Sequence, residues 1–234
     1  MSHEQIVLKI FEFVILLFAL SLHEASHAWM ASRLGDQTAR MLGRVTLNPG
    51  KHIDILGTIV IPLVMLFLPG YGQFLIGWAK PTPVNNRNFK HFRRDDILTT
   101  LAGPGSNIMA AIACMIVLIG IALIAPNGQL AVHALASGQW GVAFMPGVSI
   151  IFPISLIFYI GVWLNLMLTI FNLLPIPPLD GSHVFRHMLP YNWLRYYDSI
   201  GIMGLVLILF LGGPIIGFFL TPAITLVDII LLHI

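Results

Sequence analysis

The sequence predicts an all-α, multi-pass membrane protein with about four spanning helices and a re-entrant hairpin. Of its 234 residues, 57% are hydrophobic and only 9% are charged, whereas a soluble domain carries about 25% charged residues. Several apolar runs reach the roughly 20 residues that a helix needs to cross a bilayer. We therefore expect one membrane-embedded domain over residues 1–234.

Four segments fit spanning helices, at residues 6–33, 97–125, 148–174 and 200–220. The first is expected to be retained, because no segment has the features of a removable signal. Gly212-Gly213-Pro214 predicts a bend in the last one. After Thr221 the chain can lie at the membrane interface or fold back, and both courses stay open.

Residues 53–79 are apolar, but basic residues flank both of their ends. Gly57, Pro62 and Pro69-Gly70-Tyr71-Gly72 interrupt the run, and its second arm is too short to span a bilayer. We expect this segment to enter and leave on the same side, as a re-entrant element or tight hairpin. Irregular backbone at that depth needs protein or a water-filled cavity around it.

The positive charges predict which loops face the cytoplasm, because cytoplasmic loops collect lysine and arginine. These residues cluster after the first helix, before residue 97 and after Asp180, whereas residues 126–147 and the tail after Asp198 carry none. The N-terminus and residues 126–147 are therefore expected outside. The predicted location is the cell membrane, with the active site toward the cytoplasm.

The motif His23-Glu24-Ala25-Ser26-His27 lies in the first predicted helix. Positions i and i+4 share a helix face, so His23 and His27 can aim two imidazoles at one metal ion. Glu24 is placed to act as general base on a metal-bound water. The alternative is a pair of packing or interface histidines beside a carboxylate. Three ionisable groups in one turn of a spanning helix favour the metal site.

A zinc site with two histidines needs a third protein ligand. Asp180 fits best, because it follows the cytoplasmic end of the third predicted helix in a proline-broken segment that cannot stay helical. Gly181 after it allows a tight backbone. The weaker candidates lie in polar surface segments or at a helix end: His52, Asp54, Asp36, and the i, i+4 pair His183 and His187.

Three motifs resemble the site-2 protease family of intramembrane metalloproteases, peptidase family M50. They are His23-Glu24-x-x-His27, Ala102-Gly103-Pro104 with Asn107, and residues 171–181, Phe-Asn-Leu-Leu-Pro-Ile-Pro-Pro-Leu-Asp-Gly. The resemblance covers roughly residues 20–185. Residues 77–85 are similar to a segment of a branch without PDZ or CBS domains, and no stretch here is long and polar enough for either.

The resemblance implies one zinc ion held by His23, His27 and Asp180, with Glu24 as general base. It also implies that Asn172 binds substrate or the developing oxyanion. A membrane-embedded β-hairpin within residues 53–79 would receive an unwound substrate strand.

Trp78 and Asn107 are further candidates for substrate binding. Each has a structural alternative: Trp78 as an anchor at the membrane interface, and Asn107 as a bridge between closely packed helices.

The predicted function is that of a zinc-dependent intramembrane endopeptidase, whose partners are a single-pass membrane protein substrate and the lipid bilayer. The formal charge of +2 gives no indication of nucleic acid binding, and no oligomeric state is predicted. Two alternatives stay open: another zinc-dependent membrane hydrolase, such as a lipid hydrolase, and a non-catalytic metal-binding or transport protein. Glu24 favours an enzyme, because a carrier needs no general base beside its ligands.

Overall fold

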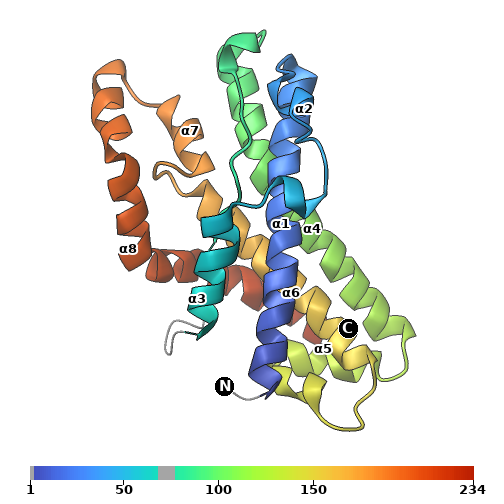
Figure 1. Ribbon diagram of the computed structural model, residues 1–234. Helices are drawn as coiled ribbons and strands as arrows, with labels where there is room; N and C mark the ends of the chain where they lie inside the picture. Colours follow the sequence, from blue (N-terminus) through green and yellow to red (C-terminus); the bar gives the residue numbers. More distant parts are fainter. Residues whose placement is uncertain (1–2, 68–76) are drawn as a thin grey trace.

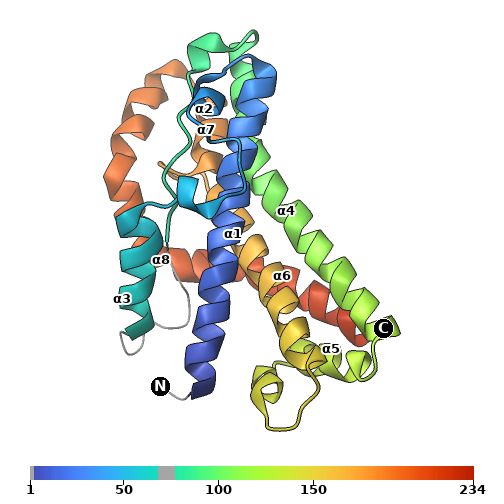
Figure 2. The same ribbon diagram turned by 45° about the vertical axis from the view of Figure 1, so that its right-hand side comes forward.

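Three long helices form the centre of the computed structural model, which describes residues 3–67 and 77–234. They are α1 (His3–Leu34), α4 (Phe92–Ile124) and α6 (Ile151–Leu173). α4 packs extensively against both α6 and α1, and Figures 1 and 2 show the three helices crossing one another. The described residues contain no strand, as an all-α protein requires.

Four helices within the described ranges are long and apolar enough to cross a membrane. They are His3–Leu34, Phe92–Ile124, Ile151–Leu173 and the last part of α8, Gly213–Leu232. The chain is therefore a multi-pass membrane protein, as predicted. The first three match their predicted spans to within a few residues, and the predicted span 200–220 lies within α8 (Tyr191–Leu232).

The last helix, α8 (Tyr191–Leu232), has non-helical backbone at Gly201, with φ 36°, a break that the sequence did not predict. Figures 1 and 2 show that the last part of α8 also runs in a different direction from its first part, and Pro214 lies inside this helix. The tail, whose course the sequence left open, is helical to Leu232. Asp228 of this tail accepts a hydrogen bond of 2.6 Å from the Tyr159 hydroxyl of α6, which connects the tail to the bundle.

The re-entrant segment begins with a helical arm, η2 (Ile55–Val60) followed by α3 (Ile61–Phe67). α3 runs back toward the N-terminal end of α1 (Figure 1). The two ends of the segment are paired: Trp78 N donates to Gly57 O at 3.2 Å, and Thr58 Oγ1 donates to Trp78 O at 2.7 Å. The two ends of the segment therefore lie side by side.

The β-hairpin implied for this segment is not what its first arm forms. Residues 55–67 are helical, and a helix satisfies its own backbone groups in an apolar environment, whereas an unpaired strand does not. The expected turn at Pro69-Gly70-Tyr71-Gly72 lies outside the described residues.

Short helices connect these elements. α5 follows α4 in the sequence and packs against both α4 and α6, close to the C-terminus of the chain (Figure 2). η3 precedes α4. Gly35 ends α1 with φ 117°, and a side chain there would also press on Asn88 O. The short helices are α2 (Thr38–Met41), η1 (Pro49–Lys51), η3 (Asn86–Asn88), α5 (Gly128–Ala136), η4 (Trp140–Phe144) and α7 (Asp180–Arg186).

The apolar core and the polar groups occupy different parts of the long helices. The core contains Leu16 and Leu20 of α1, Leu118 of α4, and Leu156 and Ile160 of α6, all buried. The buried histidines of α1 come after this core along the helix, at positions 23 and 27. The bundle therefore supplies a rigid apolar base from which the polar groups of the next turns are positioned.

Candidate metal centre

The three predicted metal ligands converge at one point between α1 and the first residue of α7. The Nε2 atoms of His23 and His27 are 3.1 Å apart, and they lie 3.1 and 3.4 Å from Asp180 Oδ2. Around a tetrahedral zinc ion with bonds of 2.0–2.1 Å, neighbouring ligand atoms are about 3.3 Å apart. The three atoms thus have the spacing of one face of a tetrahedral site.

Hydrogen bonds behind each imidazole fix which nitrogen faces the cluster. His27 Nδ1 lies 2.7 Å from Thr99 O, and His23 Nδ1 lies 2.7 Å from Asn107 Oδ1. Asn107 Nδ2 donates to Asn165 Oδ1 at 2.8 Å, so its Oδ1 is the acceptor for His23. Each Nδ1 therefore carries the proton, and each neutral ring turns a bare Nε2 toward Asp180.

The electrostatics of this cluster call for a cation. The Oδ2 atom of Asp180 is buried without a hydrogen-bond donor, and the Nε2 atoms of His23 and His27 face it at 3.1 and 3.4 Å. Three lone-pair atoms face one another, and only a proton or a metal ion between them relieves the repulsion. The donor set and its spacing fit zinc.

The loop before α7 turns Asp180 inward. Tyr197 of α8 donates a hydrogen bond of 2.9 Å to Pro175 O, which ties this loop to α8. Gly181 lies so close to the end of α6 that a Cβ there would collide with the carbonyl groups of Leu173 and Leu174. The proline-rich segment and the glycine together bring the carboxylate back against α1.

Gly103 of α4 packs directly against the two histidine rings. A Cβ at this position would lie 2.6 Å from His27 Cε1 and 2.7 Å from His23 Cε1. The absence of a side chain at Gly103 therefore leaves room for the two imidazoles.

Glu24 is half-buried and bound by a residue that the sequence analysis did not select. Thr82 N donates to Glu24 Oε2 at 2.8 Å, and Thr82 Oγ1 donates to Glu24 O at 3.0 Å. The available signal was the position of Thr82 between two prolines in the motif of residues 77–85.

The three residues predicted to bind substrate lie in different places. Asn172 is on the last turn of α6, where its Nδ2 donates to Leu168 O at 2.9 Å. Trp78 packs on Gly57, where the two ends of the segment 53–79 meet, and its side chain is 39% exposed. Asn107 is fully buried behind His23, which supports its structural alternative.

The weaker ligand candidates do not join the cluster of His23, His27 and Asp180. Asp36 and His52 are buried elsewhere, and His183 is exposed. His187 is not a solvated surface residue as expected. Its Nε2 lies 2.7 Å from Asp96 Oδ2 in a half-buried pair that joins the end of α7 to α4.

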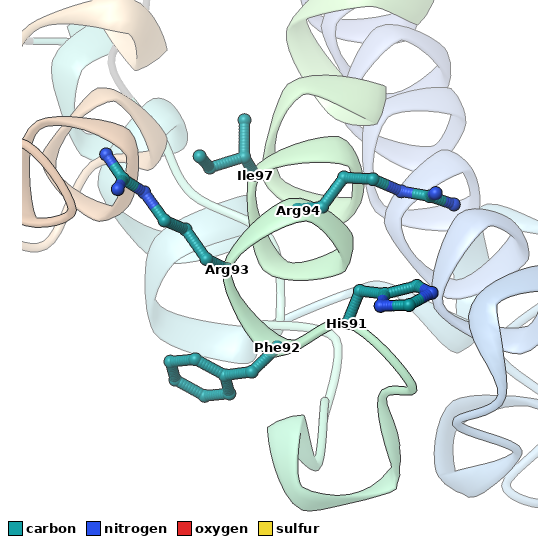
Figure 3. Close-up of a pocket in the computed structure, with 5 residues that line it drawn as sticks. All are labelled: His91, Phe92, Arg93, Arg94 and Ile97. Atoms are coloured by element: carbon teal, nitrogen blue, oxygen red, sulfur yellow. The ribbon is translucent and has the colours of Figure 1, made fainter.

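A separate pocket of about 530 Å³ lies at the first turn of α4. Figure 3 shows its lining, with Arg93 and Arg94 pointing to opposite sides of the helix. None of its residues belongs to the metal cluster: they are His91, Phe92, Arg93, Arg94 and Ile97. The pocket is part of the basic end of the bundle.

Comparison with known proteins agrees with this geometry. The model of peptidase family M50 matches residues 11–211. The chain belongs to peptidase family M50. It is 38% identical over 177 residues to a Bacillus subtilis protein named "Putative zinc metalloprotease YwhC", an alignment that covers 76% of this chain and 68% of the relative.

A second member of the family comes from Mycobacterium tuberculosis (strain H37Rv). It is named "Putative zinc metalloprotease Rip2" and is 29% identical over 211 residues, which cover 87% of this chain and 67% of the relative. The Rip2 protein of Mycolicibacterium smegmatis is 28% identical over 169 residues, or 70% of this chain and 52% of the relative. No solved structure matches the chain.

Proposed function

We propose that this M50 peptidase is a zinc-dependent intramembrane endopeptidase, which cleaves a single-pass membrane protein in or near its transmembrane segment. The observation that carries the proposal is the convergence of His23 Nε2, His27 Nε2 and Asp180 Oδ2 at tetrahedral spacing, with Glu24 next to them on a helix long enough to span a bilayer. Two relatives named as zinc metalloproteases support the choice of metal.

The residues divide the chemistry of peptide hydrolysis among them. His23, His27 and Asp180 would hold the zinc ion, which would lower the pKa of a water to about 7 and polarise the scissile carbonyl. Glu24 would take the proton from this water as its oxygen adds to the carbonyl carbon and the C=O π electrons move to the carbonyl oxygen. Glu24 would then give the proton to the amine nitrogen, so that the C–N bond breaks and the C=O bond forms again.

Asn172 is the candidate for stabilising the oxyanion. One hydrogen of its amide is used by Leu168 O, and an asparagine amide has two. The second is available for a substrate oxygen, a type of contact worth about 3 kcal/mol where it has been measured.

The position of the site supports cleavage toward the cytoplasmic side of the cell membrane. His23 is 11 residues from Leu34, the end of α1, which corresponds to about 17 Å along a helix. The segments beyond that end carry the basic residues, and cytoplasmic loops are rich in such residues. Asp180 keeps 20% of its side chain exposed, so water can enter from that side.

The experiment compares wild type with Glu24→Gln in membranes that contain a model single-pass substrate. Wild type should cleave the substrate, whereas Glu24→Gln should not, although it binds as much zinc. Glu12→Gln is the matched control on the same helix, because Glu12 pairs with Lys9 three turns away from the site, and it should cleave normally. Normal cleavage by Glu24→Gln would refute its role as base. Cleavage of lipids but not of any peptide would favour the alternative hydrolase.

A further inference from the structure

Residues 79–88, which are non-helical up to Asn85 and end in η3 (Asn86–Asn88), cross α1 beside the metal cluster, and we name this segment the strap. Its backbone is held at one end by Lys80 N, which donates to His52 O at 2.8 Å. At the other end Asn85 N donates to Asp36 Oδ2 at 2.8 Å, and Asn88 Nδ2 donates to Asp36 Oδ1 at 2.7 Å. Thr82 lies between these anchors and contacts Glu24.

The sequence of the strap makes Thr82 a rigid donor. Pro81 and Pro83 have no backbone N–H, so Thr82 supplies the sole amide donor of residues 81–83. Pro83 also restricts Thr82 to an extended backbone, because the α conformation clashes with the proline ring. That single, conformationally restricted donor is the one bound to Glu24 Oε2.

The two bonds from Thr82 act on different parts of Glu24. The amide holds one carboxylate oxygen, Oε2, at 2.8 Å, and the hydroxyl holds the main-chain carbonyl at 3.0 Å. The hydroxyl bond docks the strap on α1, so the amide meets the carboxylate at a fixed distance. With Oε2 held, the rotation of the carboxylate is restricted and Oε1 is the oxygen left for proton transfer.

We propose that Thr82 is a positioning residue, which orients the carboxylate of Glu24 for its work as a base. The inference rests on the proposed function of the site, because it assigns a task to Thr82 in that same reaction. A carboxylate that rotates freely has the correct geometry only part of the time. Loss of positioning should therefore lower kcat while leaving KM and zinc content as they are.

The kinetic test uses the purified protein in lipid nanodiscs with a model transmembrane substrate. Thr82→Val removes the hydroxyl bond but keeps the shape, and kcat should fall about tenfold with KM within about twofold of wild type. Thr82→Ser keeps the hydroxyl and should restore most of the activity. Thr46→Val is the matched control, because the Thr46 hydroxyl accepts from the nearby Asn48 N and not from α1.

Three kinetic outcomes would overturn the proposal. They are an unchanged kcat in Thr82→Val, an equal loss in Thr82→Val and Thr82→Ser, and a rise in activity, which would mean that the strap inhibits Glu24 instead of orienting it.

A second measurement does not depend on proteolysis. Hydrogen exchange of the Thr82 amide is simple to observe, because the prolines on both sides have no amide. Glu24→Ala should increase its exchange rate at least tenfold, whereas Glu12→Ala should not. An unchanged rate would show that Glu24 does not hold the strap and would overturn the proposal. If wild type cleaves no substrate at all, the proposed function fails, and the exchange rate still decides whether the contact exists.

Discussion

At the scale of single residues, the metal centre depends on a small side chain as much as on its ligands. Gly103 leaves the space in which the rings of His23 and His27 stand against α4. Asn107, one turn further along α4, holds His23 Nδ1. The same helix thus sets both the position and the tautomer of the first ligand.

Gly103→Ala should weaken zinc binding by about tenfold or more. The added methyl would lie within 2.7 Å of both rings, and rings displaced from their positions no longer offer tetrahedral spacing. The measurement is zinc retained by the purified protein in competition with a chelator. Gly105→Ala is the control, since nothing lies within 4 Å of a Cβ there. Equal zinc affinities for Gly103→Ala and wild type would contradict this role of Gly103.

The sequence could predict the ligands because their residue types and spacing carry the chemistry. Two histidines four apart with a glutamate beside the first, and an aspartate after a proline-broken helix end, specify donors of the correct type. Thr99 and Thr82 could not be predicted in this way. Thr99 acts through its backbone carbonyl, and Thr82 acts through its backbone amide and a hydroxyl bond to a main-chain carbonyl. No pattern of residue types marks such contacts, so only the folded arrangement reveals them.

At the scale of elements, the strap is fixed to the end of α1 by Asp36. This buried carboxylate accepts bonds from Thr38, Asn85 and Asn88. Asn86 of the strap donates to Asp96 at 2.9 Å, and Asp96 also pairs with His187 at the end of α7. The strap, α4 and the helix that carries Asp180 are therefore connected through polar contacts at the first turn of α4.

Asp36→Ala should release the far end of the strap. Burial raises the pKa of Asp36, but its hydrogen bonds outweigh this and lower it overall. Its stabilising contribution is therefore complete above about pH 4 and is lost as pH falls through the lower folded-state value. Removing the carboxylate leaves several buried hydrogen-bond donors unpaired, which lowers the free energy of unfolding by about 2 kcal/mol. At pH 8, trypsin should cut at Arg87 or Lys90 about tenfold faster.

The control for this prediction is Asp198→Ala, which removes an exposed carboxylate paired with Arg186. It should leave cleavage at Arg87 and Lys90 at the wild-type rate, as mass spectrometry of the fragments can establish. If Asp36→Ala is cut no faster than Asp198→Ala, Asp36 does not anchor the strap.

The sequence predicted the elements best where hydrophobic runs are long and uninterrupted. The spans at residues 6–33 and 148–174 are examples, because continuous apolar composition in a membrane protein has few interpretations. Residues 53–79 were harder. The basic residues at both ends predicted a re-entrant course, but the glycines and prolines within the segment could not distinguish a helical arm from a strand. The course of α8 depends on the contact between Tyr159 and Asp228, which joins residues far apart in sequence.

At the scale of the whole molecule, the orientation in the membrane decides from which side water reaches the site. The predicted orientation places the strap in the cytoplasm and residues 126–147 outside. α5, within that loop, lies at the same end of the bundle as the N-terminus of α1, and α2 lies at the opposite end (Figures 1 and 2). This arrangement places the two groups of loops at opposite ends of the bundle, as a bilayer between them requires.

Cysteine labelling tests this orientation directly, because the chain has a single cysteine, Cys114. In a Cys114→Ala background, Ser137→Cys should react with a membrane-impermeant maleimide in intact cells. Lys90→Cys should react only after the membrane is opened. Both positions are exposed in the fold, so a difference between them reports the side of the membrane and not burial. The reverse pattern would place the metal centre toward the outside, and substrates would then have to be cut from that face.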